Sequence, residues 1–130
     1  MASLTDFLIE NNVSDLTEEV ILPGRLTAFK FKISVMTNKD FEGYSRLCRR
    51  LGKQGVSFDS EKFNMMTILD HTIEPNFRDA ETIKKAGCKT PEEFVGRSLL
   101  PGEIVELARA IARLSGFSQD MNSLVDEAKN

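Results

Sequence analysis

The chain has 130 residues, of which 41% are hydrophobic and 28% are charged, and its formal net charge is −3. This composition excludes a disordered protein, and the length indicates one domain over residues 1–130. No stretch has the pattern of a signal peptide or the length of an apolar membrane span, so we expect a cytoplasmic protein. Cys48 and Cys88 lack the spacing of a metal motif and are interpreted as reduced thiols.

The first predicted element is a short helix. Ser3 can cap its start, and Leu4, Phe7 and Leu8 form a narrow apolar stripe along it. A helix of this length is marginal in water unless it docks on another surface. Residues 1–12 are therefore interpreted as a mobile helical arm that orders against a partner.

Two strands are predicted next, over residues 17–22 and 28–36. In the second run, phenylalanine, isoleucine and valine alternate with lysine and serine, which predicts one buried face and one basic face in water. Pro23-Gly24 is a turn dipeptide between the two runs. We therefore expect the strands to pair as one antiparallel hairpin.

Helices are predicted for most of the remaining chain, after the N-cap residues Thr37, Asp59 or Ser60, Asp79 and Thr90. The expected spans are 37–51, 60–71, 79–86, 90–99, 101–115 and 118–128, with residues 53–58 as a loop and Ile73 on the apolar side of the helix before it. The predicted fold class is α+β and mainly α, a compact bundle of about six helices with one N-terminal antiparallel β-hairpin.

The helix over residues 101–115 has the strongest signal in the chain. Pro101 suits a first helical turn, and apolar residues recur along one face at three- and four-residue spacing. These residues are Ile104, Leu107, Ala108, Ile111 and Leu114. None of them carries chemistry, so the stripe is interpreted as core. The helix over residues 60–71 is hydrophobic on more than one face and is predicted to lie at the centre of that core.

No pattern in the sequence predicts catalysis. His71 is the only histidine and is interpreted as a structural or partly exposed residue. Nucleophile motifs, metal-ligand spacings and glycine-rich phosphate loops are all lacking. We therefore expect a protein that is not an enzyme, with no catalytic residue, no metal ligand and no cofactor.

Charge is unevenly distributed, because residues 25–53 carry eight bases and two acids. These bases are interpreted as phosphate contacts, as a solvated basic face or as a protein-docking patch. The neighbouring aromatic residues are placed for burial instead of stacking on bases, which favours the solvated face or the docking patch over phosphate contact.

Several segments resemble, in the same order, those of the XkdN-like family of phage tail assembly chaperones, which occurs in contractile-tailed phages and phage-like elements of Gram-positive bacteria. The segments are Asp6-Phe7-Leu8, Phe29–Ile33 with Met36–Asp40, Thr72–Glu81, Leu99-Leu100-Pro101-Gly102-Glu103, Gly116-Phe117 and Val125–Asn130. The motif at 99–103 is the most distinctive, and we interpret it as a structural corner between two core helices. The connection after Leu22 is shorter than in the family.

The resemblance implies a chaperone that binds the tape measure protein, keeps its long hydrophobic helices soluble and helps to bring tail tube subunits to it. It implies action in the bacterial host cytoplasm, with no membrane partner, and absence from the mature virion. It also implies a longer form of the same protein made by a programmed frameshift, and Ala128-Lys129-Asn130 can be encoded with a slippery run of adenines. The alternative hypothesis is a small nucleic-acid-binding phage accessory protein that uses residues 25–53.

The partner site is predicted on the weakly anchored segments, which are the N-terminal helix, the hairpin edge and the last helix, with the basic face steering the partner. The candidate residues are Leu4, Phe7, Leu8, Lys30, Lys32, Arg46, Arg49, Arg50, Leu124 and Val125. We also expect self-association into a homo-oligomer through the hairpin edge or the terminal helices.

Overall fold

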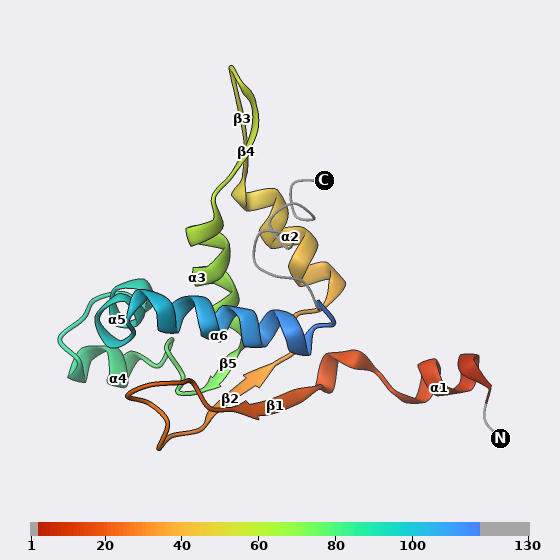
Figure 1. Ribbon diagram of the computed structural model, residues 1–130, viewed down its shortest axis with the longest axis horizontal. Coiled ribbons are helices and arrows are strands. Elements are labelled where there is room, and N and C mark those ends of the chain that lie inside the picture. The colour runs from red at the N-terminus through yellow and green to blue at the C-terminus, as the bar shows by residue number, and fades with distance from the viewer. Residues whose placement is uncertain (1–2, 118–130) are drawn as a thin grey trace.

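The computed structural model describes residues 3–117, and this part of the chain contains six α-helices and two small antiparallel sheets (Figure 1). The helices are α1 (Leu4–Glu10), α2 (Asn38–Cys48), α3 (Ser60–His71), α4 (Ala80–Lys85), α5 (Pro91–Ser98) and α6 (Pro101–Leu114), with a 3-10 turn at Val13–Asp15. The strands are β1 (Thr17–Val20), β2 (Phe31–Ser34), β3 (Arg49–Gly52), β4 (Gly55–Phe58) and β5 (Thr72–Glu74). The α+β class is confirmed. The last helix predicted over residues 118–128 lies outside the described residues.

The helix starts follow the capping residues that the sequence predicts. The side chain of Thr37 accepts a hydrogen bond from the backbone N–H of Asp40, and Thr90 does the same for Glu93. The corresponding side chains before α1, α3 and α4 also accept from the third helical N–H. Local sequence therefore sets these boundaries, because each cap satisfies a donor that the helix itself cannot pair.

The first sheet has three strands in the order β1-β2-β5, all antiparallel. The predicted pairing of the first two strands is confirmed, with Thr17 opposite Ser34 and Val20 opposite Phe31. They are joined by a longer loop over residues 21–30 instead of a tight turn. The third strand corrects the prediction for Ile73, which lies exposed in β5 and not on a helix. Three residues are too few to show an alternating pattern.

The second sheet is the hairpin of β3 and β4, which projects away from the other elements (Figure 1). The predicted loop over residues 53–58 is therefore wrong, and the predicted helix over residues 37–51 ends at Cys48. Gly55 has a positive φ of 105° in the turn, a conformation that glycine adopts without strain. Nearly all side chains of both strands are exposed, so the sequence has no buried-face alternation that would reveal them.

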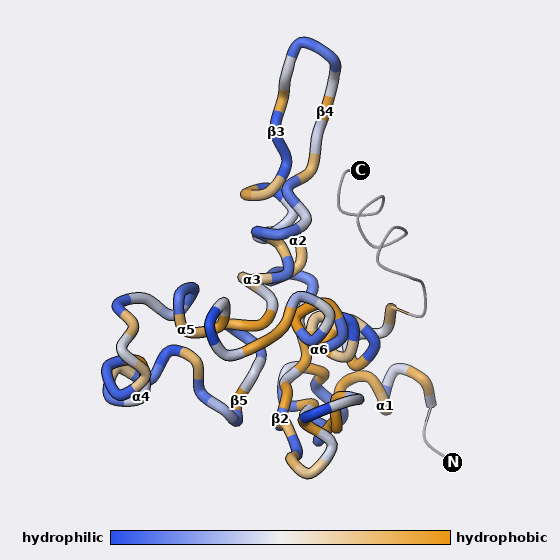
Figure 2. Tube along the Cα trace, turned by 60° about the vertical axis from the view of Figure 1, so that its left-hand side comes forward, coloured by the Kyte–Doolittle hydropathy of each residue, from blue (hydrophilic) through white to orange (hydrophobic). Residues whose placement is uncertain are grey.

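The core lies between α3, α6 and the inner face of the first sheet (Figure 2). Phe63 and Ile68 of α3 and Leu107 and Ile111 of α6 are almost fully buried. The central place predicted for α3 and the core role predicted for the α6 stripe are confirmed. The prediction of a compact bundle is not confirmed, because α1 and the β3–β4 hairpin both extend from the body (Figure 1).

Candidate protein-docking surfaces

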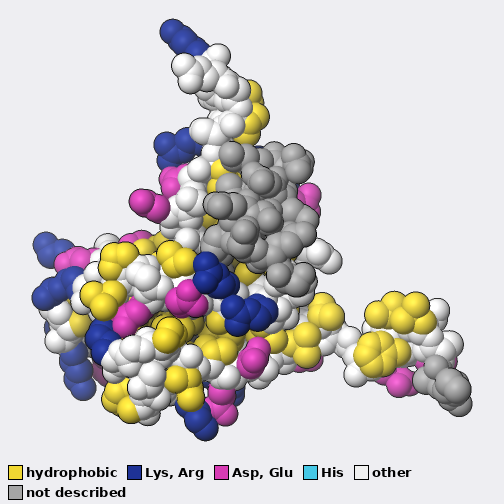
Figure 3. Space-filling view, in the orientation of Figure 1, with side chains coloured by type: hydrophobic (Ala, Val, Ile, Leu, Met, Phe, Trp, Pro, Cys, Tyr) yellow, Lys and Arg dark blue, Asp and Glu magenta, His cyan; other side chains and the backbone are white. Residues whose placement is uncertain are grey.

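The N-terminal arm, defined as residues 3–16, carries exposed apolar side chains away from the core (Figure 3). No residue of α1 is buried, and its large apolar residues are more than half exposed. They are Leu4, Phe7, Leu8 and Ile9, followed along the arm by Val13 and Leu16. The arm has three acids and no lysine or arginine. It therefore presents an apolar and acidic surface to any partner.

The hairpin patch, defined as residues 46–51 with Val56, is the second exposed apolar surface. Leu51 lies directly opposite Val56 in the ladder and is 91% exposed, and Leu47 is also exposed at the end of α2. A hollow of about 310 Å³ is lined by Leu51 and Val56 and by the three arginines Arg46, Arg49 and Arg50. The structure thus brings the candidate residues Arg46, Arg49 and Arg50 together, beside Leu51 and Val56, which the sequence did not single out.

Part of the patch's positive charge is balanced locally. Arg50 contacts Asp59 at 3.2 Å, and the longer pair of Arg46 with Glu42 spans 3.8 Å between two exposed side chains. Such exposed pairs contribute little stability. Arg49 donates from Nε to the backbone carbonyl of Ser45. The patch keeps a net positive charge against an incoming partner.

The two candidate lysines lie elsewhere. Lys32 is on β2, and its ladder partners are Glu19 on one side and Glu74 on the other. Lys30 immediately precedes β2 in the connection from β1. Figure 1 places this sheet far from the β3–β4 hairpin. Lys30 and Lys32 therefore do not share a surface with Arg46, Arg49 and Arg50, which weakens the nucleic-acid alternative. The candidates Leu124 and Val125 lie outside the described residues.

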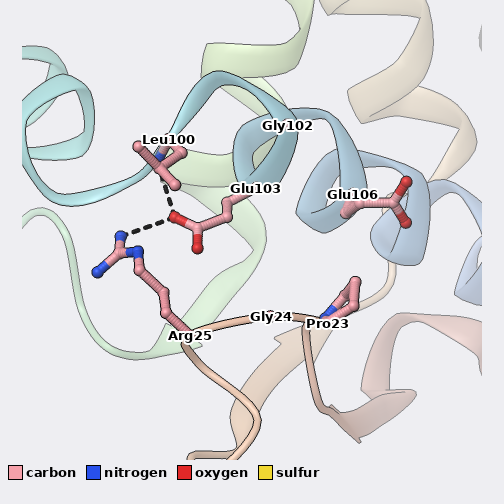
Figure 4. A pocket seen from close by; sticks show the side chains of 7 residues that line it. All are labelled: Pro23, Gly24, Arg25, Leu100, Gly102, Glu103 and Glu106. Atoms are coloured by element: carbon pink, nitrogen blue, oxygen red, sulfur yellow. Dashed lines mark hydrogen bonds and ion pairs between the residues drawn. The ribbon is translucent and has the colours of Figure 1, made fainter.

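The motif at 99–103 forms the corner between α5 and α6 (Figure 4). Leu99 is buried, and Glu103 is only 7% exposed although it is charged. The carboxylate of Glu103 accepts a hydrogen bond at 2.7 Å from the backbone N–H of Leu100 and another at 2.7 Å from Arg25. Arg25 also donates to the carbonyl of Ser98 at 2.7 Å. These bonds join the β1–β2 loop to the corner.

The corner lies between two helices, and its contact with Arg25 was not foreseen from the sequence. The Arg25 guanidinium and then the Leu100 N–H hold the pKa of Glu103 below its usual range. A hollow of about 450 Å³ lies between this corner and Pro23-Gly24. No local signal could identify Arg25 as the partner, because 78 residues separate it from Glu103.

Disruption of this contact is expected to lower the urea midpoint of unfolding. Arg25→Ala removes the guanidinium donor and Glu103→Gln removes the carboxylate charge, so each eliminates the ion pair, and the double variant should unfold at a midpoint close to that of the more affected single variant. Urea denaturation followed by circular dichroism measures all four proteins. Midpoint shifts that add in full would contradict a direct coupling between the two side chains.

A third feature is a polar cluster between α2 and the end of α3. The phenol of Tyr44 donates to Asp70 at 2.6 Å and contacts Nε2 of His71 at 2.9 Å. Asp70 also accepts a 2.7 Å bond from Arg78, and Asp40 lies 3.7 Å from the imidazole. Burial lowers the pKa of His71 against the opposing effect of Asp40 and Asp70, so the neutral imidazole is favoured. Burial and the hydrogen bond to Asp70 raise the pKa of Tyr44 above its usual range.

This cluster supports a structural interpretation of His71, which is buried and not partly exposed. Within residues 3–117, no group of three or more His, Cys, Asp or Glu side chains is arranged to hold a metal ion. Cys48 and Cys88 are both buried free thiols, and burial raises the pKa of Cys48. None of the described helices is long and apolar enough to cross a membrane.

The arrangement defines a small α+β protein whose exposed apolar side chains are concentrated on two projecting segments. Among solved structures, the crystal structure of the protein YqbN has a TM-score of 0.63 and 18% sequence identity to this chain. The likeness covers 91% of this chain and 99% of that one, which shows a common fold. No curated protein matches the sequence.

Residues 4–129 match the family of phage XkdN-like tail assembly chaperone proteins, so the chain belongs to that family. The resemblance found in the sequence is confirmed. The protein is a phage tail assembly chaperone, and its partners are tail proteins in general.

Proposed function

We propose that this chain is a non-enzymatic chaperone that binds the phage tape measure protein and helps to recruit tail tube subunits to it. The observation that supports this most is the placement of the exposed apolar residues on the N-terminal arm and the hairpin patch. A chaperone needs apolar surface that it can offer to a client and later withdraw. Segments that project from the core can do this without opening the fold.

The N-terminal arm is suited to reversible binding. A seven-residue helix is too short to be stable alone, so α1 gains stability when its apolar side chains are covered. Coupled ordering and binding gives a lower affinity than a rigid surface of the same area would give. That property fits a chaperone that leaves before the tail is complete.

The hairpin patch supplies positive charge for attracting a client. Its arginines would attract acidic stretches of a client and orient them over Leu51 and Val56. The proposed place of action is the bacterial host cytoplasm, and the finished virion would lack the chain. A frameshifted longer form would share both surfaces, because it would contain the same residues.

Loss of apolar side chains from the arm is expected to leave the tape measure protein insoluble. The test is co-expression of this chain with the tape measure protein of the same phage, with the soluble fraction of the tape measure protein as the readout. Phe7→Ser combined with Leu8→Ser should lower that fraction several-fold, because both side chains are exposed and make no core contact.

The matched control is Phe29→Ser, since Phe29 is exposed to a similar degree, 63% against 57% for Phe7, but lies outside the arm and the hairpin patch. It should keep the client soluble. Equal solubility with the arm variant and the unchanged chain would refute the role of the arm.

A further inference from the structure

The N-terminal arm and the hairpin patch are complementary to each other. Both expose large apolar side chains, and their charges are opposite. The arm carries Asp6, Glu10 and Asp15 with no base, whereas the patch carries Arg46, Arg49 and Arg50 around a hollow beside Leu51 and Val56. One chain therefore contains both halves of an apolar contact with matched charge.

The two halves do not meet within one molecule. Figures 1 and 2 place α1 and the β3–β4 hairpin at separate extremities of the body. The arm joins the sheet at Leu16, whose carbonyl accepts a hydrogen bond from the N–H of Val35 at 3.0 Å. This bond holds the base of the arm beside β2, away from the patch. In this structure the two surfaces therefore make no contact with each other.

We propose that the N-terminal arm of one copy docks on the hairpin patch of a second copy. Phe7 and Leu8 would cover Leu51 and Val56, and the acids of the arm would lie against the arginines. The two contacting surfaces differ, so the same contact builds either a head-to-tail chain or ring, or a two-fold dimer in which each arm lies on the patch of the other copy.

The expected strength follows from the size of the surfaces. An arm of a few exposed residues buries less area than a standard stable interface, so assembly is weak and depends on protein concentration. The charge pairs are exposed at the rim, so salt weakens the contact. This inference stands apart from the proposed function, because it concerns copies of this chain alone. If both hold, a client and a second copy compete for the same surfaces.

The test is sedimentation velocity of the full chain over a range of concentrations at low salt. Two charge-reversed variants are compared with it. The arm variant carries Glu10→Lys and Asp15→Lys, which leave the Ser3 cap of α1 intact. The patch variant carries Arg46→Glu and Arg49→Glu, which break only an exposed ion pair and one bond to a backbone carbonyl.

The unchanged chain should form species larger than a monomer. Each variant alone should need at least about tenfold more protein to associate, because like charges then face each other across the contact. An equimolar mixture of the two variants should restore assembly, since the lysines of one arm meet the glutamates of the other patch. Restoration also excludes a simple folding defect, because a misfolded variant would not be rescued.

The control variant is Lys85→Glu with Lys89→Glu, which changes net charge as the patch variant does at exposed residues remote from both surfaces. It should associate like the unchanged chain. A chain that stays monomeric at every concentration, variants that assemble normally, or a mixture that stays monomeric would each overturn the proposal. So would a patch variant that assembles normally but loses the tape measure protein, since the patch would then belong to the client alone.

Discussion

Phe63→Ala is expected to lower the free energy of unfolding by about 3–5 kcal/mol, which is the usual cost of removing a large buried aromatic side chain. Phe63 is 2% exposed and lies at the centre of an aromatic group. Its ring centroid is 5.4 Å from that of Phe58, 5.9 Å from Phe41 and 6.2 Å from Tyr44. These neighbours belong to α2 and to the end of β4. The cavity left by Phe63→Ala would therefore also weaken the packing at the point where the hairpin joins the core.

Urea denaturation measures this loss, with Phe29→Ala as the control because that ring is largely exposed. The control should change the free energy of unfolding by less than about 0.5 kcal/mol. Since a domain of this size has only about 5–15 kcal/mol of stability, Phe63→Leu provides a milder second variant. A loss below about 1 kcal/mol for Phe63→Ala would contradict the central position of this side chain.

The second large effect is a loss of stability when the pH falls from 7 towards 5. The pKa of His71 in the folded chain is below its ordinary value of 6.5, first because the imidazole is buried. The unfolded chain therefore takes up a proton before the folded chain does. Stability is fully present above pH 6.5 and declines as the pH falls towards the folded-state pKa, by at most about 1.4 kcal/mol per pH unit for one proton.

The measurement is the urea midpoint of unfolding across this pH range. His71→Asn should remove most of the slope between pH 5 and 7, whatever it does to stability at pH 7. Tyr44→Phe tests the partner, because it removes the phenol that contacts both Asp70 and His71. We expect that variant to cost about 1–3 kcal/mol at pH 7, since it leaves Nε2 of the buried His71 without its hydrogen-bond partner. An unchanged slope in His71→Asn would assign the pH dependence to other groups.

The surfaces that concern function differ from the core in how they respond to substitution. Phe7, Leu8 and Leu51 make no core contact, so their replacement should leave the unfolding midpoint nearly unchanged. Changes in client solubility or in self-association caused by these residues can therefore be separated from loss of fold. The variants in the core and at the corner are expected to lower the unfolding midpoint without altering the exposed apolar surfaces.

Much of the fold follows from short-range patterns. The caps at Thr37 and Thr90, the apolar stripe of α6 and the pairing of β1 with β2 were all predictable, because each depends on residues a few positions apart or on adjacent segments. The exposed stripe of α1 was also visible. For the candidate site, the sequence pointed to the arm and to the three arginines of the patch.

Other features depend on contacts between distant segments. No sequence pattern indicated β5, because its three residues form a strand only by pairing with the edge of β2. The β3–β4 hairpin was missed because its side chains are exposed on both faces, which leaves no alternation to detect. The partner of Glu103 was missed because Arg25 reaches it only when the β1–β2 loop folds against the corner.

The sequence by itself thus determined the family, the main helices and the apolar arm, since these depend on local spacing and on the order of motifs. Only the tertiary structure decided which residues surround each basic side chain of residues 25–53. Strand pairing places Lys32 between Glu19 and Glu74, and the hairpin carries Arg49 away from them to stand beside Leu51. The energy of an interaction between charges depends on their distance in space, and the fold separates basic residues that lie close together in the sequence.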